Sequence, residues 1–239
     1  MNRYNRNILM IEESGQQKLL NSKILIAGAG GLGSTVIVNL ASLGIGKLGI
    51  IDNDKLDITN LNRQYIHKFE NIGKDKVDSA EEWIKSFNPD IEVEKFKLRL
   101  NEDNAESIIS KFDLVIDCFD SYASKFILND ICNKLKKPLI HGGVMEYSGQ
   151  VLTIFPEKSA CLRCIFPDAN LDAYVVKGII SPTVSVIASL QAMEAAKVIL
   201  GEDNLLIDKL LTYNGKLQEF KKINLTKNQA CPLCSTLKV

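Results

Sequence analysis

The sequence predicts an α/β fold in which helices cover both faces of a mostly parallel sheet. Up to residue 148, short apolar segments alternate with longer amphipathic ones, which is typical of parallel strands joined by crossover helices. In addition, the strand-like segment 23–27 continues directly into a glycine-rich turn and then into a helical pattern. This order of strand, glycine turn and helix is how a doubly wound sheet begins.

The elements of this sheet can be predicted in order along the chain. Residues 3–20 are expected to be helical with a break at Ser14 and Gly15, and residues 55–73 are expected to form a long loop. The predicted strands are 23–27, 48–51, 91–94, 114–116 and 139–140, and the predicted helices are 34–43, 74–87, 101–111 (with Asn101 as N-cap) and 124–136.

After residue 148 the pattern changes. Residues 150–155 form a strand without a preceding crossover helix, so we expect that strand to be antiparallel. Residues 157–182 are predicted to be irregular, and residues 183–200 to form a helix that is apolar nearly all round, as in a core or an interface. A hairpin is expected within 205–225 around Asn214 and Gly215. No linker separates these parts, so a single domain over residues 1–239 is predicted.

Composition excludes several classes of protein. The 239 residues carry 29 basic and 29 acidic side chains, so no net charge attracts nucleic acid or a membrane surface. Neither a signal peptide nor an apolar segment long enough to span a bilayer is recognised, which predicts a cytoplasmic protein. In that compartment, six cysteines indicate metal binding or catalysis before disulfides.

The glycine-rich turn predicts a nucleotide site. Glycines allow a phosphate to approach bare N–H groups at a helix N-terminus, and the turn contains Gly28, Gly30, Gly31 and Gly33. Asp52 and Asp54 follow the next strand at the spacing of an acid that binds a ribose hydroxyl. The alternative is that these two aspartates serve a turn.

Two further groups of residues indicate which nucleotide is bound: the polar residues of the loop after the second strand together with Lys76, and the aspartates after the strand 114–116. The loop supplies Asn60, Arg63 and Gln64, and Lys76 follows it. A triphosphate needs such a cluster of cationic and polar groups to neutralise and orient its phosphates, whereas an NAD site does not. The alternative is a solvated charged loop. Asp120 ends the segment after the strand 114–116, where a carboxylate can hold Mg²⁺ on phosphates, while Asp117 has an alternative role in a turn or as an N-cap.

The cysteines form two CxxC pairs, which predict a zinc site. The four thiols of a tetrahedral Zn²⁺ site would be Cys161, Cys164, Cys231 and Cys234. A redox dithiol is the alternative, but it requires a CxxC at a helix N-terminus, where neither pair is predicted to lie. Of the other candidates, Cys118 and Cys132 are expected to be small core residues, and His67 and His141 to be structural or adjacent to substrate rather than metal ligands.

Together these motifs resemble the ubiquitin-activating-enzyme-like adenylyltransferases of bacterial sulfur-carrier pathways, the MoeB/ThiF/HesA family. The resemblance covers nearly the whole chain in the family's order. It rests on RYNR (3–6), GAGGLG (28–33), DND (52–54), NLNRQ (60–64), GKDK (73–76), DCFD (117–120), GQV (149–151), CLRC (161–164), SLQAMEAAK (189–197) and CPLC (231–234).

The resemblance implies a Rossmann-like nucleotide-binding part, 1–148, and a part, 149–239, that contains carrier-binding, crossover-loop and zinc segments. It implies that ATP and the C-terminal carboxylate of a ubiquitin-like sulfur carrier ending in Gly-Gly give an acyl-adenylate and pyrophosphate. By the same resemblance Gly31 lies against the nucleotide, Asp54 binds the ribose, Asn60, Arg63 and Lys76 contact phosphates, and Asp120 holds Mg²⁺. Arg6 resembles the arginine that one subunit of a homodimer lends to its neighbour's ATP, and the paired cysteines resemble the family's zinc ligands.

Two positions depart from the family's pattern. Tyr174 stands about where several members have a reactive cysteine, so we expect adenylation without a covalent cysteine step. Ser121 replaces the usual Asn beside the adenine and Mg²⁺ positions. No rhodanese-like segment follows, so the sulfur donor is expected to be a separate protein. The alternatives are adenylation of a peptide or small-molecule carboxylate, and a nucleotide- or NAD-binding module without turnover.

Overall fold

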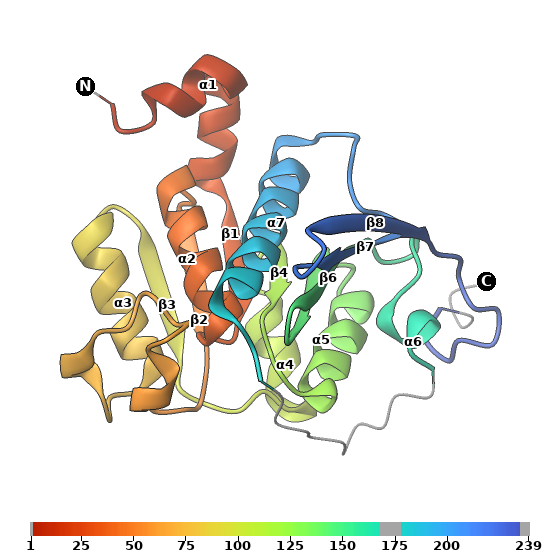
Figure 1. Cartoon of the computed structure of the whole chain (residues 1–239). Helices are drawn as coiled ribbons and strands as arrows, with labels where there is room; N and C mark the ends of the chain where they lie inside the picture. Colours follow the sequence, from red (N-terminus) through yellow and green to blue (C-terminus); the bar gives the residue numbers. More distant parts are fainter. Residues whose placement is uncertain (1, 168–177, 235–239) are drawn as a thin grey trace.

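A single sheet organises the protein. The computed structural model describes residues 2–167 and 178–234, and within them the sheet has eight strands in the order β3-β2-β1-β4-β5-β6-β7-β8 (Figure 1). The strands are β1 (Lys23–Ala27), β2 (Lys47–Ile51), β3 (Glu92–Phe96), β4 (Leu114–Asp117), β5 (Leu139–Met145), β6 (Ser148–Ile154), β7 (Lys209–Asn214) and β8 (Glu219–Asn224). The first five are parallel to one another, and β6 to β8 add an antiparallel extension, as the sequence predicts.

Helices cover both faces of this sheet. They are α1 (Asn5–Asn21), α2 (Gly31–Leu43), α3 (Lys76–Phe87), α4 (Glu102–Ile109), α5 (Tyr122–Lys134), α6 (Leu162–Ile165) and α7 (Ser181–Leu200), and two 3₁₀ turns, η1 (Ile58–Asn60) and η2 (Phe69–Asn71), interrupt the loop after β2. The chain leaves β1 toward β2 and β3, then returns to place β4 on the other side of β1. In sheets with such a reversal, ligands bind in a crevice at the carboxyl ends of the strands on either side of it, which here are β1 and β4.

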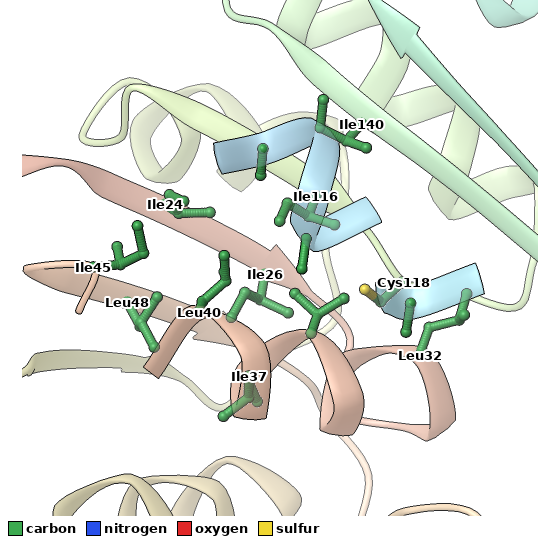
Figure 2. Close-up of a cluster of buried hydrophobic side chains, with 14 of the residues drawn as sticks. Ile24, Ile26, Leu32, Ile37, Leu40, Ile45, Leu48, Ile116, Cys118 and Ile140 are labelled. Carbon is green, nitrogen blue, oxygen red and sulfur yellow. The ribbon is translucent and has the colours of Figure 1, made fainter. Parts of the chain in front are cut away.

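The core has one half on each side of the sheet because successive strand residues point to opposite faces. Ile24 and Ile26 of β1 pack with α2 and α7, and Figure 2 shows them against Leu40 of α2. Leu25 and Ala27 of the same strand pack instead with α4 and α5. Strand β1 is therefore buried on both faces, which explains its continuous apolar sequence.

Helix α1 corrects one prediction. The helix does not break at Ser14 and Gly15 but at Glu12, whose backbone is non-helical with φ of 59°. Gly15 lies within the helix, at a point where α1 is tightly packed. A Cβ at this position would lie 2.8 Å from Cβ of Ile11 and 3.3 Å from Leu200 of α7. The glycine therefore permits close packing and does not end the helix.

Strand β5 is longer than predicted. The sequence suggests a strand over 139–140 that ends before a glycine pair, whereas β5 continues to Met145 and pairs with β6 along its whole length. Gly142 lies within this strand and packs closely against α7. A Cβ at this position would come 2.3 Å from Cδ of Gln191, so a residue with a side chain would not fit there. The other predicted strands and helices lie where expected, with ends shifted by a few residues, but one turn of helix, α6, lies within the segment 157–182 that was predicted to be irregular.

Helix α7 is long and apolar enough to span a membrane by length and composition, and it is the one described helix that is so. However, half of its most apolar window is buried in the protein, where it packs against α2 and β5 (Figure 1). Its composition is that of a central core helix.

Candidate functional site

The glycine turn between β1 and α2 forms the floor of the candidate site. Gly28 has φ of 108°, a conformation that side chains rarely adopt. A Cβ on Gly33 would lie 1.9 Å from the carbonyl oxygen of Gly28, so the first turn of α2 packs directly on the preceding loop. No side chain caps α2 at Gly30. The helix N-terminus thus offers backbone N–H groups and a favourable dipole to an anion.

The two aspartates after β2 have different partners. Both carboxylate oxygens of Asp52 accept backbone hydrogen bonds, one from Ala29 N and one from Asp54 N, each at 2.8 Å. Burial raises the pKa of Asp52, and the nearby Lys76 ammonium opposes that shift. Asp54 forms an ion pair with Lys76, with Nζ 2.8 Å from Oδ2. The Asp54 side chain is 59% exposed, whereas that of Lys76 is only 8% exposed. Asp54 is therefore the acid with room for a ribose.

The long loop after β2 is closed at its base. Leu56 N donates to Lys74 O at 2.9 Å and Gly73 N donates to Leu56 O at 2.8 Å, so the two ends of the loop lie together. Lys76 N also donates to Asp54 O at 3.0 Å. This closure places Lys76, the first residue of α3, beside the acid at the end of β2.

Side chains inside that loop turn toward the glycines. Asn60 and Asp57 form a reciprocal capping box around η1. Arg63 is held by hydrogen bonds from Nη1 to Thr59 O at 3.0 Å and to Asn62 Oδ1 at 2.9 Å. Gln64 lies against Gly30 and is 3% exposed, and its Oε1 has no partner among the described residues. The structure therefore brings Arg63, Gln64 and Lys76 together around the glycine turn.

A buried charged network lies under the end of β4. The Asp117 carboxylate accepts from Lys125 Nζ at 3.0 Å and from His141 Nδ1 at 2.7 Å, and it is completely buried. Burial by itself would raise the pKa of Asp117, but the Lys125 charge and the His141 hydrogen bond bring that pKa below its ordinary value. Burial also lowers the pKa of His141, so its ring is neutral: Nδ1 donates to Asp117 and Nε2 accepts from Gln150.

Asp117 also shapes the turn that follows it. Its Oδ1 accepts from Phe119 N at 3.1 Å, which confirms the predicted turn role. Asp120 comes next on the exposed side of this turn, and Ser121 is the N-cap of α5, accepting from Ser124 N at 3.4 Å. The network of Lys125 and His141 was not predicted. The sequence showed only a lysine, Lys125, within the predicted helix 124–136.

The structure does not bring Arg6 to this site within one chain. Arg6 is exposed in the first turn of α1, two residues after Tyr4. Tyr4 packs against Gly44, which ends α2, and its hydroxyl accepts from Asn88 at 2.9 Å. Gly44 and Asn88 both precede strands, so Arg6 lies near the amino ends of the strands, opposite to the crevice.

The four paired cysteines converge. Their sulfur atoms all lie within 4.8 Å of one another. The separations include 3.4 Å for Cys161–Cys234, 3.6 Å for Cys164–Cys234 and 3.7 Å for Cys161–Cys231. With Zn–S bonds of about 2.3 Å, a tetrahedral site has sulfur–sulfur edges of about 3.8 Å. The thiol set therefore fits Zn²⁺ and joins Cys231 and Cys234 to α6 and its N-cap.

The prediction that neither CxxC pair lies at a helix N-terminus was wrong. Cys161 is the N-cap of α6, so the first CxxC pair does begin at a helix, although that helix is a single turn. The convergence of both pairs, and not their distance from helices, is what favours a metal. Cys118 and Cys132 are buried, as predicted, and burial raises the pKa of both thiols. The position of Tyr174 lies outside the described residues.

Comparison with known proteins gives consistent matches over the whole chain. The ThiF family profile matches residues 4–233. A Culex quinquefasciatus protein named "Adenylyltransferase and sulfurtransferase MOCS3" is 39% identical over 98% of this chain, which spans about half (55%) of that relative. The Haloferax volcanii "SAMP-activating enzyme E1" is 34% identical and the Thermus thermophilus "Sulfur carrier protein adenylyltransferase" is 32% identical, each over 98% of this chain and 88% or 90% of its own length.

Solved structures of a biosynthetic enzyme are also similar to this chain. Escherichia coli MccB, described as a microcin C7 biosynthetic enzyme, superposes with a TM-score of 0.89 in complex with N-formylated MccA, at 25% identity over 98% of this chain and 75% of that one. Its complex with ATP superposes with a TM-score of 0.85, also at 25% identity over the same shares of the two chains. The fold of this chain is thus similar to that of a protein solved with ATP.

Proposed function

Since this chain belongs to the ThiF family, we propose that it is an ATP-dependent adenylyltransferase acting on the C-terminal carboxylate of a ubiquitin-like sulfur-carrier protein. The observation that carries the proposal is the convergence of Arg63 and Lys76 with the glycine turn and the exposed Asp54. A nicotinamide dinucleotide does not need two cations there, whereas a triphosphate losing pyrophosphate does. The similarity to proteins named as activators of SAMP and of a sulfur carrier supports the substrate class.

The site residues are proposed to divide the work between binding and charge stabilisation. The first turn of α2, with Gly28, Gly30, Gly31 and Gly33, would face the nucleotide, with Gln64 behind Gly30. Asp54 would bind the ribose, while Asp52 would keep the glycine turn in place through its bond to Ala29. Asn60, Arg63 and Lys76 would contact the phosphates, and Ser121 would lie at the edge of the adenine pocket.

The chemistry proposed needs alignment and charge neutralisation. A carboxylate at neutral pH is already a nucleophile, so no general base is required. The barrier comes from bringing one anion to another and from the negative charge that develops on the departing pyrophosphate. Arg63 and Lys76 would stabilise that charge, because fixed cations in a partly buried crevice are stronger than in water. Mg²⁺, a cation that prefers carboxylate oxygens, would be held by Asp120 and supply further neutralisation.

A second chain is proposed to complete the site. Arg6 lies at the far end of its own subunit, yet it is exposed and follows the well-anchored Tyr4. Exposed Leu9 and Met10 are 81% accessible beside it on the same helix. We infer a homodimer in which Arg6 reaches the neighbour's ATP, with residues 149–239 contributing the carrier-binding surface and structural Zn²⁺ bound by the four cysteines. A separate protein would supply sulfur.

The similarity to MccB supports a second candidate substrate. MccB has been solved with the peptide MccA, and its fold matches this chain closely. A peptide or small-molecule carboxylate is therefore the alternative acceptor. It ranks second because the relatives named as activators of SAMP and of a sulfur carrier are 34% and 32% identical to this chain, compared with 25% for MccB.

Carrier-dependent exchange of pyrophosphate with ATP tests the proposal. The purified chain is expected to exchange labelled pyrophosphate into ATP only when a carrier with a free Gly-Gly terminus is present. Asp120→Ala should reduce exchange by about 100-fold, as for other groups that stabilise developing charge. Glu202→Ala, an exposed acid after α7, is the matched control and should exchange normally. Exchange with a peptide but with no Gly-Gly carrier would favour the second candidate, and normal exchange by Asp120→Ala would contradict the assignment of Asp120.

A further inference from the structure

Ala29, in the middle of the glycine turn, is held by side chains on both sides of its backbone. Its N–H donates to Asp52 Oδ2 at 2.8 Å. Its carbonyl oxygen lies 3.0 Å from His67 Nε2, so that nitrogen carries a proton and donates to it. Asp52, just after β2, and His67, just before η2, are both distant from Ala29 in the sequence, and together they fix the orientation of its backbone.

The His67 ring is itself held in one tautomer. Since Nε2 carries the proton in the neutral ring, Nδ1 is an acceptor, and it lies 2.9 Å from Ser79 Oγ. The Ser79 hydroxyl accepts a hydrogen bond from Asn71 Nδ2 at 3.0 Å, which leaves its own proton for donation to His67 Nδ1. Asn71, His67 and Ser79 are 1%, 6% and 0% exposed. Burial lowers the pKa of His67, and the Lys76 charge acts in the same direction, so the ring is neutral.

This arrangement determines where the next backbone donor points. A trans peptide is planar, and its C=O and N–H bonds point in opposite directions. Because the Ala29 carbonyl is turned toward His67 in the interior, the N–H of Gly30 is turned away from His67. No hydrogen-bond acceptor for the Gly30 N–H is found in residues 2–167 and 178–234. Gly30 immediately precedes α2, so this donor adds to those of the helix N-terminus.

His67 also belongs to the segment that carries the cations. It follows Arg63 by four residues in the loop closed at its base next to Lys76, while Ser79 lies on α3 one turn after Lys76. The Asn71–Ser79–His67–Ala29 chain thus joins the loop, α3 and the glycine turn through buried hydrogen bonds. A shift of His67 would change the position of the loop cations relative to the glycine backbone.

We propose that His67 is a positioning residue for the nucleotide: its hydrogen bond to Ala29 orients the Gly30 N–H toward the ATP phosphates and fixes the loop that carries Arg63 against the glycine turn. The inference rests on the proposed function, because it assigns ATP to this crevice. His67 does not touch the nucleotide and takes no part in proton transfer. Its effect is to keep the phosphate-binding donors preorganised.

Two substitutions separate this role from simple packing. His67→Gln keeps a donor at about the reach of Nε2, and its amide oxygen can still accept from Ser79. His67→Phe keeps a ring of similar volume but removes both hydrogen bonds. We expect His67→Phe to raise the KM for ATP in the exchange reaction about tenfold, a change of about 1.4 kcal/mol, as the loss of a buried hydrogen bond predicts. The KM for the carrier should be unchanged, and His67→Gln should stay within about threefold of the wild type.

The result is read against two controls. Thermal unfolding shows whether each variant is folded, and Ser79→Ala is a second variant that leaves the ring in place but removes its support, so it should also raise the KM for ATP selectively. A folded His67→Phe protein with an unchanged KM for ATP would overturn the inference while leaving the proposed function intact, and so would equal losses for ATP and carrier. A wild type that catalyses no exchange at all overturns the proposed function, and the assignment to His67 with it.

Discussion

Replacing Lys125 with methionine tests the buried charge network beneath the site. Lys125 is 6% exposed and its ammonium donates to both Asp117 oxygens, at 3.2 and 3.0 Å, and to the carbonyl of Gly142 at 2.8 Å. Methionine fills a similar volume but carries no charge. The substitution therefore leaves a completely buried carboxylate whose remaining side-chain partner is His141.

The expected cost follows from the burial of the pair. Removing one partner of a buried ion pair typically costs about 3–5 kcal/mol of unfolding free energy, because the other charge stays buried without compensation. His141 can reduce that cost by taking up a proton. Its pKa is now lowered first by burial and also by the Lys125 charge. Without that charge, Asp117 favours the imidazolium, and we expect the pKa of His141 to rise above its ordinary value.

The sign of the pH dependence follows. A histidine whose pKa is raised in the folded state contributes stability below its unfolded pKa of about 6.5 and loses that contribution as the pH rises through the raised folded value. The variant should therefore be closer to the wild type in stability at pH 5.5 than at pH 8. Urea unfolding of both proteins at the two pH values, followed by circular dichroism, measures the difference.

Two related variants sharpen the result. Lys125→Arg keeps the charge and should lose less stability at pH 8 than Lys125→Met. The double variant Asp117→Asn with Lys125→Met removes both charges and should recover part of the loss, because a neutral amide tolerates burial better than an unpaired carboxylate. A loss that is the same at both pH values, with no recovery in the double variant, would refute the reasoning from charge balance.

Two further predictions concern metal and packing. Cys164→Ser should lose bound zinc and unfolding free energy together, measured by metal analysis and thermal unfolding; a wild type that is fully stable without metal would contradict the site. Gly33→Ala should destabilise the protein by about 3 kcal/mol or more and abolish ATP binding, because the new Cβ would lie 1.9 Å from a backbone oxygen that cannot rotate away. Gly73→Ala is its control: that glycine has a φ of 86° but open space around it, so the cost should be about 1 kcal/mol, without loss of ATP binding.

Much of the parallel sheet could be predicted because local sequence decides it. The segments 23–27 and 48–51 are short and mostly apolar, and both become strands that differ from the prediction by at most one residue. Asn101 was correctly identified as an N-cap, since it accepts from Asp103 N and Asn104 N. In these cases the physical cause lies within a few residues of its effect.

The details of the site could not be predicted in the same way, since they depend on contacts between distant segments. Asp52 and Asp54 look equivalent in the sequence, yet the register of β1 beside β2 places Asp52 under Ala29 and leaves Asp54 exposed. Likewise, Lys125 meets His141 around Asp117 only because β4 and β5 are neighbours in the sheet. Neither strand order nor register can be read from the residues of one strand alone.

The ion pair between Lys76 and Asp54 shows how the free site differs from the nucleotide-bound site that we propose. In this structure the two side chains bind each other at 2.8 Å, and the Lys76 side chain is 8% exposed. If Asp54 binds the ribose and Lys76 a phosphate, ATP must take over bonds that the pair now makes. On this proposal Asp54 would compensate the buried Lys76 charge until ATP binds, since a buried charge without a partner would be costly. The Asp54 side chain is 59% exposed, so water can solvate its carboxylate when the pair opens, while a phosphate would replace it as the partner of Lys76. The exchange of partners is therefore cheap, and the crevice can be preorganised for a triphosphate without a large cost on binding.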